Sequence, residues 1–134
     1  MKKALPLLIL VLLFLLPACA AGGSSQSGGG AIYHKISASE AKAMMEKGNP
    51  FYLVDVRTQA EYDAERIDGA VLIPYDQIGS LAPTELPDKS ALIFTYCRTG
   101  ARSSVAAHTL VDMGYTNVFD IGGIQDWPYG TISG

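Results

Sequence analysis

Two continuous apolar runs constrain the fold more than any other feature of this sequence. Residues 51–56 read FYLVDV and residues 91–96 read ALIFTY, so apolar side chains fill nearly every position rather than every second one. A strand of this kind is buried on both faces, which is typical of a parallel sheet covered by helices. We therefore predict an α/β fold with a mostly parallel central sheet and helices on both of its faces.

The segments around these runs fit helices and strands in alternation. Ser37 and Glu40 form a capping-box pattern that begins a helix. Pro83 and Pro87 divide the stretch before the second apolar run into a turn or short helix and a loop. The remaining predicted elements are two helices, at residues 58–65 and 103–113, and two short strands, at residues 70–73 and 117–121.

The beginning of the chain has the pattern of a signal peptide. Lys2 and Lys3 precede a nearly unbroken apolar run at residues 5–16. This run is too short to span a bilayer as a helix, which takes roughly 20 residues, but it suits the core of a signal peptide. Residues 16–19 (LPAC) resemble a bacterial lipobox, in which the signal peptide is removed before the Cys and the Cys sulfur is lipidated. The alternative is ordinary secretion, with Cys19 near the cleavage site by chance.

The lipobox resemblance divides the chain into three parts. Residues 1–18 are predicted to be the signal peptide, residues 19–31 a lipidated Cys19 with a flexible tether rich in Gly and Ser, and residues 32–134 the folded domain. We expect an extracytoplasmic lipoprotein anchored to a membrane, at the cell surface or in the periplasm. Two of the 10 basic residues lie in the signal peptide, so 8 remain against 13 acidic residues and the formal net charge is −5. This charge argues against nucleic acid as a partner and against membrane binding through a polybasic segment.

The cysteine count singles out one thiol. The sequence has 2 cysteines, and lipidation of Cys19 would leave Cys97 as the only free one. An unpaired thiol outside the cytoplasm is exposed to oxidation, which favours a function for it. Cys97 follows the second apolar run directly, at the carboxyl end of a strand, where ligands bind in open parallel sheets. The alternative is that Cys97 is a small buried hydrophobic residue.

The loop after this strand has the composition of an anion site. It reads Cys97-Arg98-Thr99-Gly100-Ala101-Arg102 and leads into a predicted helix. Backbone N–H groups of such a turn, with the helix N-terminus, form a cradle for a thiolate or an oxyanion. The two arginines add positive charge, and these surroundings lower the pKa of a cysteine and make it nucleophilic. We predict that Cys97 is catalytic and that the rest of the loop binds the substrate anion.

Residues 97–103 (CRTGARS) resemble the active-site loop of rhodanese-like sulfurtransferases. The family usually has Gly-His where this sequence has Glu65-Arg66. The resemblance extends over roughly residues 36–127 and includes further segments that are similar to motifs of the family. These segments are residues 53–57, 61–62, 67–70, 73–74, 114–118 and 122–127.

The resemblance implies a rhodanese-like fold and an enzyme of the thiosulfate sulfurtransferase type that uses no cofactor. Cys97 would take sulfane sulfur from a small-molecule donor such as thiosulfate and pass it, as a persulfide, to a thiol or cyanide. Arg98 and Arg102 would attract the anionic donor, and the N–H groups of the loop would hold the persulfide. A protein thiol is a further candidate acceptor.

Asp55 and Arg57 leave the end of the first apolar run, close to where the Cys97 loop is expected. One interpretation is that Asp55 pairs with an arginine such as Arg102 and thereby fixes the loop. The other is a local ion pair, or a cap for the helix at residues 58–65. Neither makes the two residues catalytic.

Other functions of the same thiol remain open. A non-catalytic persulfide carrier or docking module would use the same loop, and a redox protein would cycle Cys97 through sulfenic acid. Cys-based phosphatases and arsenate reductases use Cys-x5-Arg, whereas only four residues separate Cys97 from Arg102, a loop that suits a single sulfur atom better than a phosphate. No metal site is predicted, because His34 and His108 are far apart in the sequence.

Overall fold

The computed structural model describes residues 32–134. The predicted signal peptide, the lipidation site Cys19 and the tether fall on residues 1–31 and lie outside the described residues. None of the helices within residues 32–134 has the length and apolar character needed to cross a membrane.

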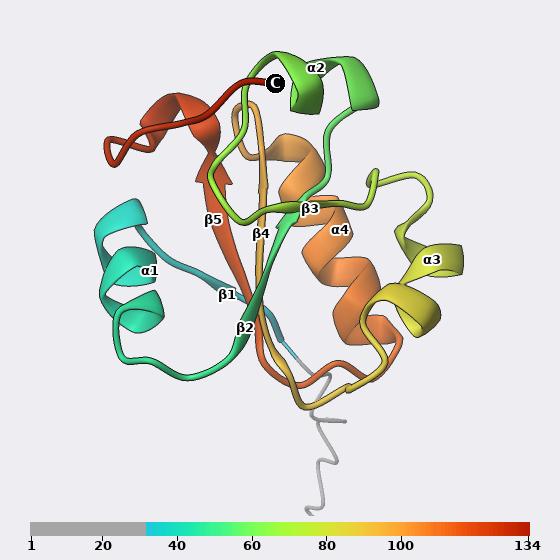
Figure 1. The fold of residues 1–134 in the computed structure, drawn as a ribbon. Coiled ribbons are helices and arrows are strands. Elements are labelled where there is room, and N and C mark those ends of the chain that lie inside the picture. Colours follow the sequence, from blue (N-terminus) through green and yellow to red (C-terminus); the bar gives the residue numbers. More distant parts are fainter. Residues whose placement is uncertain (1–31) are drawn as a thin grey trace, which may run out of the picture.

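Five parallel strands form one sheet. They span His34–Lys35 (β1), Phe51–Asp55 (β2), Val71–Leu72 (β3), Leu92–Cys97 (β4) and Val118–Gly123 (β5). Their order across the sheet is β1-β5-β4-β2-β3, and every neighbouring pair is parallel. The two apolar runs therefore lie side by side as β2 and β4 near the centre of the sheet (Figure 1).

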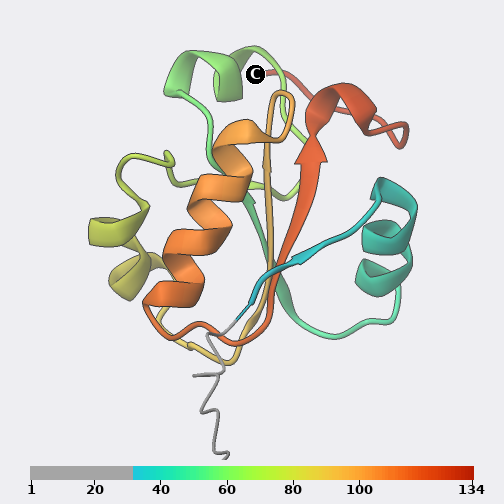
Figure 2. The same cartoon turned by 180° about the vertical axis from the view of Figure 1, so that it is seen from behind.

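Helices cover both faces of this sheet. They span Ala38–Met45 (α1), Gln59–Ala64 (α2), Ile78–Glu85 (α3) and Ala101–Asp112 (α4), with a short 3-10 turn at Ile124–Asp126. α1 lies on one face, α3 and α4 lie on the other, and α2 lies beyond one end of the strands (Figures 1 and 2). The predicted α/β fold, with a parallel sheet between two layers of helices, is confirmed.

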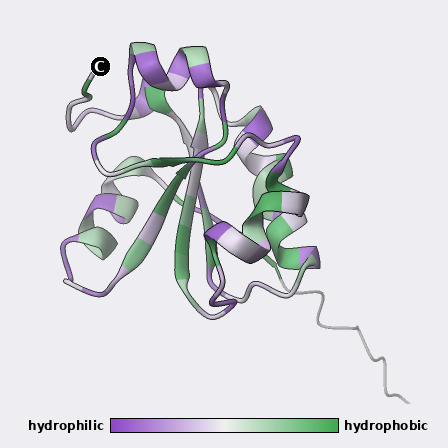
Figure 3. Ribbon diagram, turned by 45° about the vertical axis from the view of Figure 1, so that its right-hand side comes forward, coloured by the Kyte–Doolittle hydropathy of each residue, from purple (hydrophilic) through white to green (hydrophobic). Residues whose placement is uncertain are grey.

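The sheet separates two apolar cores. Leu53 and Phe94 belong to the core under α1, whereas Val54 and Ile93 belong to the core under α3 and α4. Successive side chains of a strand point to opposite faces, so both faces are apolar only if the run is continuous. Figure 3 shows the resulting concentration of hydrophobic residues in the central strands.

The stretch before β4 contains a short helix, α3, and a loop, as predicted, but Pro83 lies inside α3 and does not end it. A proline removes the amide that would bond the carbonyl four residues earlier, here that of Gly79. Gly79 is exposed, so water can take the place of that amide. The hydroxyl of Tyr115 lies 3.0 Å from the carbonyl oxygen of Ala82 and 2.7 Å from that of Leu86, and these contacts fasten the end of the helix.

β1 has no counterpart in the sequence prediction. It is two residues long and exposed, and it pairs with β5 at the edge of the sheet. The ring of His34 stacks on that of Phe119, with 5.2 Å between the ring centroids. A strand this short carries no apolar run that could reveal it.

The carboxyl ends of the parallel strands meet at one edge of the sheet. β2 ends at Asp55, which lies beside Tyr96 of β4, and Cys97 lies beside Gly123 of β5. The loop between β4 and α4 therefore emerges at this edge, next to α2 (Figure 1).

Candidate active site

Cys97 is the last residue of β4, and the loop that follows it turns directly into α4. Gly100 is the N-cap residue of this helix and has a φ of 108°. Residues other than glycine rarely adopt this backbone conformation. The Cys97 side chain is only 1% exposed. The predicted strand, loop and helix are thus all present, and the thiol lies at the bottom of the loop.

The sulfur of Cys97 has polar partners in spite of its burial. The backbone N–H of Gly100 donates to Sγ at 3.0 Å, and the hydroxyl of Ser103 lies 3.6 Å from Sγ. Burial disfavours the thiolate, but the Ser103 hydroxyl and the backbone amides of Ser103, Gly100 and Thr99 outweigh it and lower the pKa of the Cys97 thiol. The site can therefore hold a negatively charged sulfur.

Ser103 connects the loop to the end of β5. Its hydroxyl donates to the carbonyl oxygen of Gly100 at 3.0 Å, with the carbonyl oxygen of Gly122 at 3.3 Å. Gly122 in turn donates its N–H to the carboxylate of Asp120 at 2.9 Å. Asp120 is fully buried, and these bonds connect the turn at Gly122 to the start of α4.

The two arginines of the loop have different surroundings. Arg98 is exposed, and within residues 32–134 it forms no salt bridge. It lines a hollow of about 310 Å³ together with Glu61 and Glu65. Arg102 forms a two-point ion pair with Glu61, in which both N–O distances are 2.8 Å. Arg102 therefore already has an anionic partner, whereas Arg98 forms no salt bridge within residues 32–134.

Glu61 is itself held by the helix to which it belongs. It is the third residue of α2, and its carboxylate accepts hydrogen bonds at 3.0 Å from the N–H and the hydroxyl of Thr58, which completes a capping box. The hydrogen bonds from Arg102 lower the pKa of Glu61 to about 2, with the Thr58 bonds contributing and burial opposing. The carboxylate is therefore ionised over the whole physiological pH range.

Asp55 pairs with Arg57 and not with Arg102. The guanidinium of Arg57 contacts both oxygens of Asp55, at 2.7 to 3.1 Å, and both side chains are almost completely buried. The hydroxyl of Tyr96 also donates to this carboxylate at 2.8 Å. Burial alone would lower the pKa of Arg57, but the bonds to Asp55 raise it above its ordinary value. The interpretation as a local ion pair is confirmed, and the pairing of Asp55 with Arg102 is wrong.

Glu65 and Arg66, which stand in place of the usual Gly-His, attach the end of the described chain to α2. Arg66 exchanges two backbone hydrogen bonds of 2.8 Å with Ile132. The hydroxyl of Thr131 donates to the carboxylate of Glu65 at 2.8 Å, and the carbonyl oxygen of Glu65 accepts from Arg57. Glu65, which lines the same hollow as Arg98, and Arg66 therefore connect the end of α2 to Arg57 and to residues 131–132.

Three residues of the site carry no predicted role: Glu61, Ser103 and Tyr96. Glu61 has a visible signal, since it stands three residues after Thr58 with the spacing of a capping box. Ser103 ends the CRTGARS segment, but its sequence position does not reveal its contacts, and Tyr96 has no signal at all. The contacts of both residues depend on how the loop folds over the sheet.

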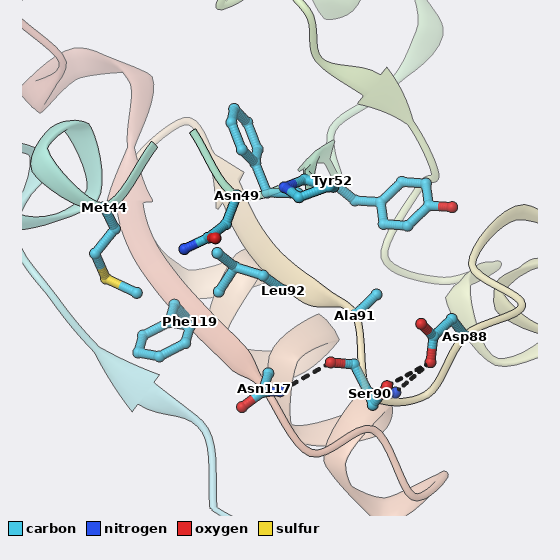
Figure 4. A pocket seen from close by; sticks show the side chains of 11 residues that line it. Met44, Asn49, Tyr52, Asp88, Ser90, Ala91, Leu92, Asn117 and Phe119 are labelled. Atoms are coloured by element: carbon cyan, nitrogen blue, oxygen red, sulfur yellow. Dashed lines mark hydrogen bonds between the residues drawn. The ribbon is translucent and has the colours of Figure 1, made fainter. Parts of the chain in front are cut away.

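A hollow larger than the one beside Arg98 lies at the opposite end of the sheet and contains no residue of the Cys97 loop. It measures about 810 Å³ and is lined by the apolar side chains of Met44, Leu92 and Phe119, with Asp88 and Ser90 at its rim (Figure 4). No group of three or more His, Cys, Asp and Glu side chains within residues 32–134 lies close enough to hold a metal ion.

Comparison with known proteins places this geometry in a family. The family model for the rhodanese-like domain matches residues 37–128. The chain is 37% identical over 73 residues to the thiosulfate sulfurtransferase PspE of Escherichia coli, which covers 54% of this chain and 70% of PspE. It is 31% identical over 97 residues to the thiosulfate sulfurtransferase GlpE of Coxiella burnetii, which covers 72% of this chain and 88% of GlpE.

A solved structure agrees with these relatives. The chain superposes on a rhodanese with anions from E. coli with a TM-score of 0.60 and 33% identity, covering 63% of this chain and 100% of the other. Some relatives are much longer, and the chain spans only 19% and 24% of two that are named as adenylyltransferases and sulfurtransferases. The likeness to those proteins concerns only that share of their length.

Proposed function

The chain belongs to the rhodanese-like domain family, and on this premise we propose that it is a sulfurtransferase that moves sulfane sulfur through a persulfide on Cys97. The donor is a small molecule such as thiosulfate, and the acceptor is a thiol or cyanide. One observation carries the proposal: a Cys97 sulfur that accepts a hydrogen bond from the loop amide of Gly100 and whose pKa is lowered by its surroundings.

In the first step, the Cys97 thiolate attacks the outer sulfur of thiosulfate. A new S–S bond forms, the bond between the two sulfurs of the donor breaks, and its electron pair leaves with sulfite. The total charge of −3 is the same before and after, because a thiolate and a dianion become a persulfide anion and sulfite. The backbone N–H of Gly100 points at the sulfur and can stabilise the persulfide anion where it forms.

In the second step, the acceptor attacks the terminal sulfur of the persulfide. With cyanide, a C–S bond forms, the S–S bond breaks, and thiocyanate leaves while Cys97 returns to the thiolate. No proton has to move in either step if Cys97 is ionised at the start. The lowered pKa of the thiol is therefore the property on which both steps depend.

A steady-state assay tests this proposal and separates an enzyme from a persulfide carrier. Wild-type protein with thiosulfate and cyanide is expected to release thiocyanate over many turnovers, and Cys97→Ser is expected to release none. Sulfur loading of Cys97 without turnover on cyanide or a small thiol would instead identify a carrier that delivers to a protein acceptor. Turnover of a phosphate ester would favour the phosphatase alternative.

We also propose that the domain is a lipoprotein whose Cys19 carries the membrane anchor, outside the cytoplasm. The support is the basic start, the apolar run at residues 5–16 and the lipobox-like residues 16–19. Expression of the full chain with a Cys19→Ser variant tests this. The wild-type protein is expected in the membrane fraction and the variant in the soluble fraction, and equal partition of the two would contradict the lipid anchor.

A further inference from the structure

The ion pair between Glu61 and Arg102 has consequences for the substrate. Its two N–O distances of 2.8 Å describe a fork-to-fork pair, the strongest arrangement available to these two side chains. About 28% of the Arg102 side chain and 30% of the Glu61 side chain are exposed, so the pair lies at the surface of the site. A donor that uses Arg102 has to compete with a carboxylate that is already in place.

Glu61 cannot easily turn away from Arg102. Thr58, the N-cap residue of α2, holds the same carboxylate through its backbone N–H and its hydroxyl. The capping box therefore keeps the negative charge over the loop even when Arg102 moves. The capping box of α2 thus keeps Glu61 paired with Arg102, so that the guanidinium of Arg102 is not available to the donor.

The other charged side chains of the hollow that Arg98 and Glu61 line give little attraction for an anion. Arg57, which lines the same hollow, is neutralised by Asp55. Arg98 carries a positive charge without a salt bridge within residues 32–134, but Glu65 adds a further negative charge to the same hollow. The charges within each of the two ion pairs, Asp55 with Arg57 and Glu61 with Arg102, cancel each other. The positive charge of Arg98 is balanced by the negative charge of Glu65 in the same hollow.

We propose that Glu61 sets the donor selectivity of the site: by holding Arg102, it lowers the preference of Cys97 for dianionic donors such as thiosulfate relative to sulfane donors of lower charge. This proposal rests on the sulfurtransferase function proposed above. Alkanethiosulfonates are donors of the required kind, since they carry one negative charge and release a sulfinate where thiosulfate releases sulfite. The same kind of S–S bond forms and the same kind of S–S bond breaks with both donors. The two reactions therefore differ mainly in the net charge of the donor that approaches Cys97.

Glu61→Gln tests the proposal, because Gln also satisfies a capping box and leaves Arg102 without its ionic partner. We expect kcat/KM for thiosulfate to rise roughly three- to tenfold at low ionic strength, mostly through KM, since an attracting charge at a cleft raises substrate capture. The rise with methanethiosulfonate is expected to be clearly smaller. Both effects should fade in about 1 M salt, where the screening length falls to about 3 Å.

Glu65→Gln is the matched control. It removes the same formal charge from the same hollow, but Glu65 bonds to Thr131 and not to Arg102. We expect kcat/KM for thiosulfate to rise less in Glu65→Gln than in Glu61→Gln. The rise with methanethiosulfonate is again expected to be smaller than the rise with thiosulfate. An equal gain in the two variants would contradict a specific role of Arg102.

The outcomes separate this proposal from the function on which it rests. An unchanged ratio of the kcat/KM values for the two donors in Glu61→Gln would overturn the proposal while the sulfurtransferase function stands. An equal loss of kcat with both donors would make Glu61 a positioning residue and would also overturn it. Failure of every donor to load Cys97 in the wild-type protein would contradict the sulfurtransferase function itself.

Discussion

The backbone of Gly123 packs so closely against Arg98 that a Cβ atom at position 123 would overlap the carbonyl oxygen of Arg98. The same Cβ would lie 2.7 Å from the Cα atom of Thr99. Because all of these contacts are with backbone, no side-chain rotation can relieve them. The Cys97 loop therefore packs directly against the backbone at the end of β5.

Gly123→Ala is expected to displace the Cys97 loop and to abolish most of the sulfurtransferase activity. Overpacking of this kind costs about 1–3 kcal/mol of folding free energy, and here the strain falls on the loop itself. Thermal unfolding and thiocyanate release measure the two effects. Gly79→Ala is the control, since its Cβ would meet only a methyl group of Thr109 at 4.0 Å and alanine favours the helix. Equal activity of the two variants would contradict the claim that the close packing of Gly123 holds the Cys97 loop in position.

The reactivity of the Cys97 thiol is expected to rise with pH through a midpoint below 9.0, the ordinary value for a thiol, because the folded protein lowers its pKa. The rate of alkylation by iodoacetamide as a function of pH measures this midpoint. Ser103→Ala should move the midpoint upward, since it removes a hydroxyl that favours the thiolate. Ser104→Ala, whose hydroxyl contacts that of Tyr33 at 2.7 Å, should leave it in place.

The ion pair between Glu61 and Arg102 is expected to stabilise the fold in a pH-dependent way. Glu61 has a pKa of about 2 in the folded protein and an ordinary value of 4.5. A carboxyl group with a lowered pKa stabilises the folded state above its unfolded pKa, and this stability is lost as the pH falls toward the folded value. Glu61→Gln should therefore cost about 1 kcal/mol at pH 7, and the difference from wild type should shrink between pH 4.5 and about 2.

Urea unfolding of the two proteins at several pH values measures this difference. Glu85→Gln, in α3, is a control for the loss of one negative charge away from the loop. A difference between wild type and Glu61→Gln that stays constant down to pH 2 would show that the ion pair does not stabilise the fold in the manner described.

The buried pair of Asp55 and Arg57 is expected to be structural. Arg57→Ala leaves the Asp55 carboxylate buried without its main partner, which costs about 3–5 kcal/mol. Tyr96→Phe removes one hydroxyl that bonds to both Asp55 and the N–H of Ile67, and it should cost about 1–3 kcal/mol. Urea unfolding orders the two variants, and a smaller loss for Arg57→Ala than for Tyr96→Phe would contradict the assignment.

Much of the fold could be predicted from local sequence patterns. Burial on both faces of β2 and β4 follows from their continuous apolar runs, and the beginning of α1 follows from the capping box of Ser37 and Glu40. β1 could not be predicted, because a two-residue edge strand is defined only by its partner β5. A short helix could be predicted at α3, but not that Pro83 would lie inside it, which is tolerable because the carbonyl that loses its hydrogen bond belongs to the exposed Gly79.

The candidate site could be predicted in part. The loop and the position of Cys97 follow from the order of strand, loop and helix, which is a local property of the chain. The partner of Arg102 is Glu61 of α2, which lies 41 residues away in the sequence. The two residues come together only when the sheet has formed, so no local pattern reveals the pair. Gly122 has a φ of 84° and fits the predicted turn, whereas Gly123 has an ordinary backbone and is required for a close approach that no sequence pattern reveals.

The most direct test of the central claim is the intact mass of the protein after incubation with excess thiosulfate and removal of the reagent. Sulfur transfer through Cys97 predicts that the wild-type protein gains the mass of one sulfur atom and loses it again on addition of cyanide. Cys97→Ser should keep its original mass throughout. A wild-type mass that does not change with thiosulfate, or an equal gain in Cys97→Ser, would contradict the claim that Cys97 carries the sulfur.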